Sequence, residues 1–395
     1  MEMQVPETNT DSKNTKKRHP IRNTLLILLA LVVLVIVVAV IRIRKAVESL
    51  DVQYPELTGN PAVGEWYTVT PADAKSSDGS PWHGLFRLGS ENKVVIYFFG
   101  GGVSLNEQTS EQTAAKGDWF FVPNTALQDF VALGGISAAV EENPFRNWSF
   151  LVLPYGTGDF HTGTGVYQFT DQNGNDHTVY HNGYVNYVAF VEEAKKYIDA
   201  PEAILVTGFS AGGFATALLT DDVMDRFPQT ENVTACVDSA LLLYDGWHHA
   251  SADLWQSPEV ISSRLVTDNI VLDSLRALHE KRGDRVKILF TCSTRDSALQ
   301  EYQSYIRGGA MMQSRENSAR FQQDLAQMTR DLQKYIPQIG LYIWEYGISA
   351  ETDSTQHTII SSNVYDRLED DVRVIDWIYD ATCGEISSHG LSHLD

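Results

Sequence analysis

One short stretch limits the possible folds of this chain more than any other: residues 203–219, AILVTGFSAGGFATALL. An apolar, strand-like run ends in Gly-Phe-Ser-Ala-Gly at positions 208–212, and a helix-like run follows at once. Small residues at both ends of such a turn let the chain reverse sharply and lift the serine hydroxyl above a sheet. The order of strand, turn and helix predicts that Ser210 is a nucleophile; the alternative is a glycine-rich turn that binds nothing.

Short apolar runs and helical patterns alternate along much of the chain. The apolar runs predict buried strands at 93–99, 149–155, 203–209, 234–243 and 286–293. The helical patterns cover 185–198, 211–227, 319–336 and 364–381. Continuous apolar strands separated by helices predict an α/β fold whose mainly parallel sheet is flanked by helices on both faces. Functional residues are then expected at the carboxyl ends of the strands.

The N-terminal region predicts a membrane anchor. Residues 24–41, TLLILLALVVLVIVVAVI, carry no charge and make about 27 Å of helix, just enough to cross the hydrocarbon core. Five basic side chains precede this segment and three follow it, which favours a cytoplasmic N-terminus. The alternative is a signal peptide cleaved after Ala39, although the apolar run is long for a signal peptide.

This interpretation divides the chain into four segments. We expect a polar cytoplasmic tail over 1–20, one transmembrane helix over 21–43, a stalk over 44–60 and a single extracytoplasmic domain over 61–395. The last segment shows no internal repeat and no low-complexity linker, so one domain is predicted.

Charge and cysteine content argue against two kinds of partner. The formal net charge of −21 disfavours nucleic acid, because phosphate binding needs a basic surface. The three cysteines, Cys236, Cys292 and Cys383, lie far apart and lack the spacing typical of zinc ligands, so no metal site is expected. The sequence selects no pair of them for a disulfide and indicates no oligomeric state.

A serine nucleophile needs hydrogen-bond donors for the oxyanion that forms in the reaction. A triple glycine at 100–102 directly follows a predicted strand, where an α/β-hydrolase places part of its oxyanion hole. We expect the amides of Gly102 and Val103 to act there, with Gly101 beside them, and the amide of Ala211 to complete the hole. The alternative is a flexible turn.

The order of residues in α/β-hydrolases predicts an acid and then a histidine after the serine. Asp296 stands just after the predicted strand at 286–293, while Asp238 ends the strand before it. We favour Asp296 as the orienting acid and expect Asp238 to support the site through hydrogen bonds. His357, in the polar loop DSTQHTIISS, is the expected base, and Ser210 would form an acyl-enzyme that water hydrolyses.

Other histidines fit the role of the base less well. His248 and His249 are adjacent in YDGWHHAS and are expected at a loop or pocket rim. His389 and His393 lie in a Gly- and Ser-containing tail that looks frayed. Neither pair has the position in the chain that the base requires.

Taken together, these motifs resemble those of one family. FFGGGVSLNE, VLPYGTGDFHTG, VTGFSAGGFAT, CVDSALLL, TCSTRDSALQ and QHTIISS occur in one order between about residues 80 and 380. The chain resembles the pectin acetylesterase family, which includes plant pectin acetylesterases and the animal carboxylesterase Notum. The resemblance implies an α/β-hydrolase-like serine esterase without a metal or an organic cofactor. It implies catalytic roles for Ser210, Asp296 and His357, and oxyanion amides at Gly102, Val103 and Ala211.

The chain also departs from the family pattern. Val103 stands where members often have tryptophan, and Gly156 stands where they often have cysteine. Few cysteines together with a membrane anchor suggest a bacterial surface protein. Asp159 and His161, in the distinctive stretch PYGTGDFHTG, are expected to stabilise the loop that frames the pocket rather than to act in catalysis.

The sequence thus predicts a membrane-anchored extracytoplasmic serine esterase that removes acyl groups, with acetyl expected, from a polysaccharide. Its partners would be the acylated polysaccharide and the lipid bilayer. A lipid or acyl-protein carboxylesterase is the first alternative, and a non-catalytic surface binding module is the second. The complete set of candidate catalytic residues argues against the binding module.

Overall fold

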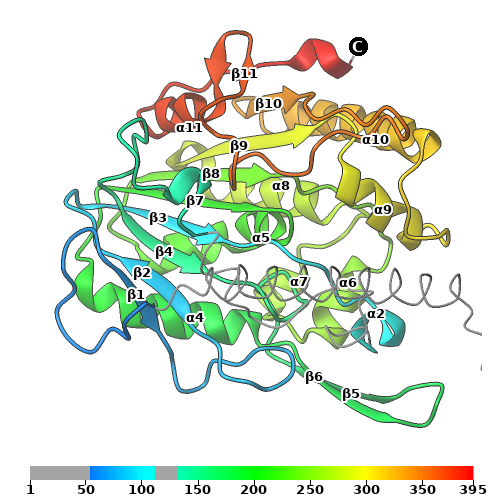
Figure 1. Ribbon diagram of the computed structural model, residues 1–395, viewed down its shortest axis with the longest axis horizontal. Coiled ribbons are helices and arrows are strands. Elements are labelled where there is room, and N and C mark those ends of the chain that lie inside the picture. Colours follow the sequence, from blue (N-terminus) through cyan, green and yellow to red (C-terminus); the bar gives the residue numbers. More distant parts are fainter. Residues whose placement is uncertain (1–53, 112–131, 395) are drawn as a thin grey trace, which may run out of the picture. The chain divides into compact units, whose positions relative to one another are not determined.

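The computed structural model describes residues 54–111 and 132–394 of the chain (Figure 1). The predicted cytoplasmic tail, the predicted transmembrane helix at 21–43 and most of the predicted stalk lie outside these residues. Within the two described ranges, no helix has both the length and the apolar character that crossing a membrane requires.

A sheet of eight strands forms the centre of the fold, in the order β1-β2-β4-β3-β7-β8-β9-β10 (Figure 1). Its strands are β1 Trp66–Val69, β2 Gly84–Arg87, β3 Lys93–Phe98, β4 Ser149–Leu153, β7 Ala203–Phe209, β8 Asn232–Asp238, β9 Val286–Ser293 and β10 Gly340–Trp344. Six neighbouring strands of this order, β4, β3, β7, β8, β9 and β10, run parallel to one another. At the edge beyond β4, β2 pairs antiparallel with β4 and β1 pairs antiparallel with β2. The mainly parallel sheet predicted from the sequence is confirmed.

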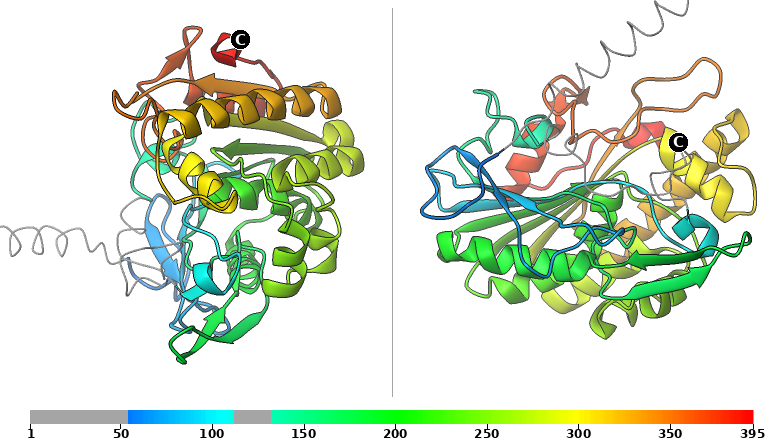
Figure 2. Two further views of the ribbon diagram at one scale, coloured as in Figure 1. Left: turned by 90° about the vertical axis from the view of Figure 1, so that its right-hand side faces the viewer. Right: turned by 60° about the horizontal axis from the view of Figure 1, so that its bottom comes forward.

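Helices cover both faces of this sheet (Figure 2). One face carries α4 Gly183–Ala194, α5 Ala211–Arg226, α8 Ile270–Arg282 and α10 Arg315–Tyr335, and the other carries α11 Val374–Thr382. The shorter helices include α2 Glu107–Glu111, α6 Trp247–His249, α7 Glu259–Ser262 and α9 Ser297–Ile306. β5 Val166–Thr170 and β6 Asp176–Tyr180 form a separate hairpin. Right-handed crossovers place α5, α8 and α10 on one face, because each joins neighbouring parallel strands in the same direction.

The central strands are apolar along almost their whole length because both of their faces are buried. Val94–Phe98 and Phe150–Leu153 have no exposed surface, and Leu205 and Val206 of the neighbouring β7 have none either. Fully burying one such side chain stabilises the fold by about 1.5–3 kcal/mol. This explains why continuous apolar runs, rather than alternating ones, mark the strands in the sequence.

The register of the sheet brings four strand ends level with one another. Phe98 of β3 pairs with Gly208 of β7, Phe209 pairs with Asp238 of β8, and Asp238 pairs with Thr291 of β9. The segments that follow β3, β7, β8 and β9 therefore leave the sheet side by side.

The predicted strands all form, and the runs at 203–209 and 286–293 coincide with β7 and β9 at both ends. The run at 234–243 continues beyond β8, which ends at Asp238. The sequence analysis does not find β1, β2, β5, β6 and β10. These strands have four or five residues each, and β5 and β6 are largely polar, so their patterns are too short or too weak.

The helix predicted at 364–381 is wrong in its first half. α11 begins only at Val374, and the residues before it form turns and the two-stranded hairpin of β11 Leu368–Glu369 and β12 Val372–Arg373. Asp370 and Asp371 form the hairpin turn with φ angles of 51° and 63°. Aspartate enters this left-handed region more readily than most residues, and a right-handed helix cannot include it.

The C-terminal residues are docked, so the expectation of a frayed tail around His389 and His393 is wrong. The amide of His389 donates to the carbonyl of Leu341 (2.8 Å), and the amide of Ile343 donates to the carbonyl of His389 (3.0 Å). The tail therefore pairs with the free edge of β10. His393 Nε2 lies 2.8 Å from a carboxylate oxygen of Glu369.

Candidate active site

Ser210 lies at the sharp turn between β7 and α5. Its φ of 54° and ψ of −124° fall outside the regions that non-glycine residues ordinarily occupy. The amide of Ser210 donates to the main-chain carbonyl of Asp238 (2.9 Å), and its carbonyl accepts from the amide of Gly213 (2.8 Å). The strained residue is thus held from both sides, as in the turn that exposes a nucleophilic serine.

Two glycines let this turn pack against β3. A Cβ atom on Gly208 would lie 2.2 Å from the carbonyl oxygen of Gly212, and one on Gly212 would lie 2.0 Å from the carbonyl oxygen of Phe98. Both distances are far inside van der Waals contact. β3 and the start of α5 therefore approach so closely that only glycine fits at either end of the motif.

Three backbone amides beside the serine are available for an oxyanion. Among the described residues, none accepts a hydrogen bond from the amides of Gly102, Val103 and Ala211. The amide of Ala211 belongs to the first turn of α5, where N–H groups lack acceptors within the helix and the dipole is positive. A Cβ atom on Gly100 would lie 2.8 Å from the Cβ of Ser210, so the glycine loop contacts the serine directly.

Hydrogen bonds from other segments fix the loop after β3. His161 Nε2 donates to the carbonyl of Phe99 (3.1 Å). Trp255 Nε1 donates to the carbonyl of Ser104 (2.7 Å), and the Ser104 hydroxyl lies 3.3 Å from His181 Nε2. These contacts hold both ends of the segment that carries the candidate oxyanion amides.

His181 and Ser104 are site-supporting residues that the sequence analysis did not single out. His181 has no exposed surface, and its Nδ1 donates to the carbonyl of Thr157 (2.9 Å), which leaves Nε2 to accept from Ser104. Burial lowers the pKa of His181, against an opposing effect of the charge of Asp159. No local pattern distinguishes this histidine, because only the fold brings it to the glycine loop.

The structure brings Asp296 and His357 together. His357 Nδ1 lies 2.8 Å from both carboxylate oxygens of Asp296, which is fully buried. One of these oxygens also caps α9 by accepting the amides of Ala298 (3.0 Å) and Leu299 (2.9 Å). Because Nδ1 donates to the carboxylate, Nε2 is the basic nitrogen of the imidazole.

Main-chain pairing puts the histidine loop beside the aspartate. The amide of Thr355 donates to the carbonyl of Arg295 (2.9 Å), and the amide of Ser297 donates to the carbonyl of Thr355 (3.0 Å). This short parallel bridge runs on either side of Asp296 and ends two residues before His357. The position of the imidazole thus depends on the backbone as well as on the carboxylate.

The pKa of His357 lies above its usual 6.5 because two effects of Asp296 outweigh the effect of burial. Burial lowers it, but the charge of Asp296 and the hydrogen bond that Asp296 accepts both raise it, and these outweigh burial. The charges of Asp238 and Glu301 add smaller increases. The site therefore favours the protonated imidazole, which forms when a histidine takes the proton of a nucleophilic serine.

Asp238 ties the serine turn to the histidine loop. One of its carboxylate oxygens accepts the amides of Ile359 (2.9 Å) and Ile360 (3.0 Å), while its main-chain carbonyl accepts the amide of Ser210. Burial raises the pKa of Asp238 to about 6, although the amides of Ile360 and Ile359 oppose this. Asp238 thus holds the two sides of the site without bonding to His357 itself.

Ser210 and His357 are not hydrogen-bonded to each other. Within the described part of the chain, neither the Ser210 hydroxyl nor His357 Nε2 has a protein partner. In structures without substrate, the hydrogen bond between a nucleophile and its base is often long, and it shortens in the reactive complex. A hydroxyl, an imidazole and a carboxylate in this order can pass the serine proton to Nε2.

Asp159 and His161 form a buried support beneath the glycine loop. One carboxylate oxygen of Asp159 accepts the amide of His161 (3.0 Å), and the other accepts the amides of Gly163 (3.1 Å) and Gly183 (2.8 Å). Burial lowers the pKa of His161 to about 4, although its hydrogen bond to Phe99 opposes this. A neutral imidazole that donates to a carbonyl serves to position the loop.

One group of side chains in the described residues has distances that would suit a metal ion. Ligand atoms of Glu111, Asp171 and His177 lie within 4.8 Å of one another, near the β5–β6 hairpin. The Asp171 carboxylate already accepts the amides of Asn173 (2.9 Å) and Asn175 (2.8 Å), as in an ordinary turn. Asp171 and His177 belong to the β5–β6 hairpin and Glu111 is the last residue of α2, so none of the three lies at the strand ends that carry Ser210 and Asp296.

A family model described as Pectinacetylesterase matches residues 65–261, which include the glycine loop and the serine turn. The chain belongs to the pectinacetylesterase family. As a pectinacetylesterase-family member it is a serine carboxylic-ester hydrolase, and the resemblance inferred from the motifs is confirmed. No curated protein sequence matches the chain.

Two crystal structures of the Wnt deacylase Notum from Drosophila have a similar fold. Crystal form II gives a TM-score of 0.54 at 15% sequence identity, and crystal form I gives 0.53 at 16%. Each comparison covers 81% of this chain and 94% of the Notum chain. At this identity the likeness establishes the mixed α/β fold with its mainly parallel sheet.

Proposed function

We propose that this pectinacetylesterase-family protein hydrolyses acyl esters with Ser210 as nucleophile, His357 as base and Asp296 as orienting acid. The observation that supports this most is the 2.8 Å distance between the buried Asp296 carboxylate and His357 Nδ1. The loop that carries His357 is also joined to the serine turn through hydrogen bonds of Asp238. The acid fixes the tautomer of the imidazole and stabilises the imidazolium that forms.

The reaction would proceed through an acyl-enzyme. Nε2 of His357 takes the proton of Ser210 as the serine oxygen attacks the ester carbonyl, and the amides of Gly102, Val103 and Ala211 stabilise the resulting oxyanion. Collapse of this intermediate expels the alcohol, which receives the proton from the imidazolium. Water, deprotonated by the same imidazole, then attacks the acyl-serine. The acyl–oxygen bond breaks, the imidazolium returns its proton to the Ser210 oxygen, and the carboxylic acid leaves.

We further propose that the substrate is an acetylated polysaccharide and that the enzyme works outside the cytoplasm. The family described as Pectinacetylesterase supports an acetyl ester on a sugar polymer. The uncharged segment 24–41 and the excess of basic residues before it support a single anchor with a cytoplasmic N-terminus. An anchored domain of this kind would reach polymers of the cell surface or its surroundings.

A second candidate is the removal of an acyl group from a protein or a lipid. Two structures with a similar fold are those of a Wnt deacylase, which is the observation in its favour. The two candidates differ in the acyl group that the enzyme prefers, short for an acetylated glycan and longer for a lipid-modified protein.

The test uses the full chain in detergent micelles with p-nitrophenyl acetate and p-nitrophenyl octanoate. Ser210→Ala should lower turnover of the acetate at least about a thousandfold. Ser263→Ala, which changes an exposed serine after α7, is the matched control and should retain wild-type turnover. Equal turnover by wild type and Ser210→Ala would remove Ser210 as the nucleophile. A strong preference for octanoate would favour the second candidate.

A further inference from the structure

Ser239, which directly follows the last residue of β8, bonds to β9, to Asp238 and to the histidine loop. Its amide donates to the carbonyl of Thr291 in β9 (2.9 Å). Its hydroxyl donates to a carboxylate oxygen of Asp238 (2.9 Å) and accepts the amide of Thr358 (3.2 Å). Because Thr358 is the residue after His357, this hydroxyl bonds to the main chain next to the candidate base.

Both partners of the bond between Ser239 and Thr358 have a strained backbone. Their φ angles of 53° and 61° lie in the left-handed region. A residue with a Cβ atom costs about 1–2 kcal/mol there, and a β-branched threonine is an outlier. Such strain persists only where the surrounding structure imposes it, and it is concentrated at functional sites. The Ser239 hydroxyl is placed to impose it on Thr358.

The conformation of Thr358 affects where the imidazole of His357 lies. The bridge between Asp296 and Thr355 fixes the loop two residues before His357, and the bond to Ser239 fixes it one residue after. Without the second contact, Thr358 could return to an ordinary φ angle, and the imidazole would move with the main chain. A displacement of about 1 Å can lower the rate of a reaction about a hundredfold.

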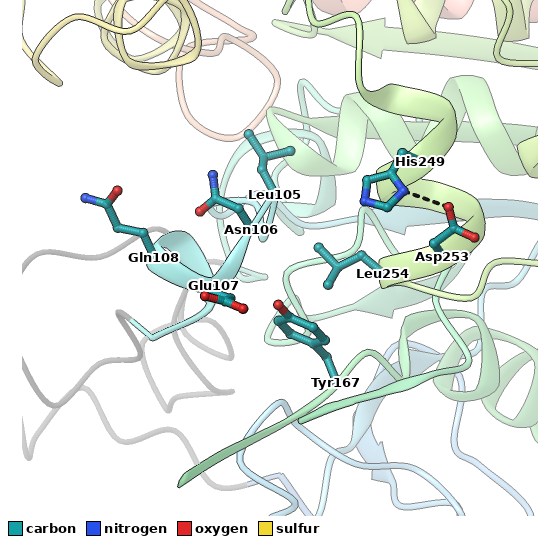
Figure 3. A pocket seen from close by; sticks show the side chains of 8 residues that line it. All are labelled: Leu105, Asn106, Glu107, Gln108, Tyr167, His249, Asp253 and Leu254. Carbon is teal, nitrogen blue, oxygen red and sulfur yellow. Dashed lines mark hydrogen bonds and ion pairs between the residues drawn. The ribbon is translucent and has the colours of Figure 1, made fainter. Parts of the chain in front are cut away.

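Ser239 does not contact a bound substrate. It has no exposed surface, and Thr358 is buried as well. Figure 3 shows the open pocket beside the start of α2, which Glu107, Tyr167 and Asp253 help to line. Neither Ser239 nor Thr358 is among the residues that line this pocket. An effect of Ser239 on the reaction must therefore act through the groups to which it bonds.

We propose that Ser239 is a positioning residue for the esterase reaction. Its hydroxyl holds Thr358 in the left-handed conformation and thereby directs Nε2 of His357 toward Ser210. The inference rests on the proposed function, because it adds a residue to the machinery of that same site. Ser239 itself neither binds the substrate nor transfers a proton.

Two substitutions separate the hydroxyl of Ser239 from the strain of its own backbone. Ser239→Gly removes the hydroxyl and adopts a φ of 53° without steric cost, whereas Ser239→Ala removes the hydroxyl and keeps the cost. The assay uses the full chain in detergent micelles with p-nitrophenyl acetate. Both variants should lower kcat about tenfold and change KM less than about twofold. The glycine variant should nevertheless unfold at a higher urea concentration than the alanine variant.

Ser274→Ala is the matched control. Ser274 is also fully buried, and its hydroxyl donates to the main-chain carbonyl of Ile270 within α8 (2.7 Å). The substitution removes a buried hydrogen bond away from the site, so kcat should stay at the wild-type value even where stability falls. A loss of kcat equal to that of the Ser239 variants would show that activity follows stability, and would overturn the inference.

A second background tests whether Thr358 transmits the effect. Asparagine enters the left-handed region more readily than threonine, so in Thr358→Asn the loop depends less on the Ser239 hydroxyl. Ser239→Gly should then lower kcat only about threefold relative to Thr358→Asn alone. An equal loss in both backgrounds would show that Ser239 does not act through Thr358, and the inference would be wrong.

The outcomes distinguish this inference from the proposed function. If Ser210→Ala abolishes turnover but both Ser239 variants keep the wild-type kcat, the inference is wrong and the esterase assignment stands. The same holds if the Ser239 variants raise KM at an unchanged kcat, or if the glycine variant is fully active while the alanine variant is not. If turnover of p-nitrophenyl acetate does not depend on Ser210, the proposed function itself fails.

Discussion

The amide of Ser210 donates to the main-chain carbonyl of Asp238 across 2.9 Å, while the Asp238 side chain binds a different part of the site. Its carboxylate accepts the amides of Ile359 and Ile360, just after the candidate base. The main chain of one residue thus holds the turn of the candidate nucleophile, and its side chain holds the loop that follows the candidate base. A substitution at this position should separate the two effects.

We expect Asp238→Ala to lower kcat for ester hydrolysis about tenfold to a hundredfold and to change KM little. The loop after His357 loses two hydrogen bonds, so the imidazole moves while the Ser210 turn keeps its main-chain bond. Asp238→Asn retains an acceptor oxygen and should recover most of the rate. Steady-state kinetics with p-nitrophenyl acetate provide the measurement, and an unchanged kcat in Asp238→Ala would contradict this role.

Asp296→Asn should lower kcat/KM about ten-thousandfold, as expected when the group that orients a catalytic histidine can no longer fix its tautomer. The carboxylate of Asp296 is buried, and His357 Nδ1 lies 2.8 Å from both of its oxygens. Asp353→Asn, at the first position of the same loop but more exposed, is the control. A loss of less than about tenfold in Asp296→Asn would assign the orienting role to another acid.

The dependence of kcat/KM on pH should show an acidic limb with a midpoint above 6.5. The pKa of His357 is raised because the charge and hydrogen bond of Asp296 outweigh burial, and a general base must be neutral to accept a proton. Activity therefore increases as pH rises through this value. In Asp296→Asn the midpoint should move to lower pH, because the main effect that raises it is gone. A midpoint that does not shift in the variant would contradict the pairing.

The sequence analysis could single out the candidate reacting groups because each lies next to a strong local pattern. Ser210 follows a buried strand and opens a helix, and the glycines at 100–102 follow another strand. Asp296 is the N-cap of a helix just after β9. Parallel strands place such positions at one edge of the sheet, so their proximity follows from the topology.

The supporting residues could not be predicted in the same way. His181 reaches Ser104 across 77 positions of the chain. Ser104 lies within FFGGGVSLNE, but nothing in that motif predicts a histidine partner, and His181 lies outside the quoted motifs. The tail around His389 lacks an apolar pattern, yet it pairs with the edge of β10 through its backbone. The two aspartates at 370 and 371 belong to a helical pattern but adopt left-handed φ angles. Contacts distant in sequence determine the structure in the first two cases, and the turn of a local hairpin determines it in the third.

Gly212→Ala should lower the free energy of unfolding by at least about 2 kcal/mol. The new Cβ would lie 2.0 Å from the carbonyl oxygen of Phe98, and backbone atoms cannot yield as a flexible side chain does. Gly59→Ala places its Cβ in open space and serves as the control. Urea unfolding followed by tryptophan fluorescence gives both values, and equal midpoints for the two variants would contradict the close approach of α5 and β3.

Stability between pH 4 and pH 7 should contain two opposing contributions from buried groups of the site. The pKa of His161 is lowered from 6.5 to about 4, so its neutral form stabilises the fold above pH 6.5, and this is lost as pH falls through 4. The pKa of Asp238 is raised from 3.8 to about 6, so its protonated form stabilises the fold below pH 3.8, and this is lost as pH rises through 6. Each contribution is about 3 kcal/mol, and together they largely cancel.

Substituting His161 should therefore reveal the pH-dependent contribution of Asp238 to the free energy of unfolding, and substituting Asp238 should reveal that of His161. His161→Gln keeps a donor for the carbonyl of Phe99 but cannot titrate, so relative to wild type its free energy of unfolding should rise by about 3 kcal/mol from pH 7 to pH 4. Asp238→Asn should change by a similar amount in the opposite direction, because it lacks the group that gains stability on acidification. Urea unfolding at four pH values measures both differences. Parallel pH curves for the two variants would show that these groups titrate as they do in the unfolded chain, and that burial does not control their protonation.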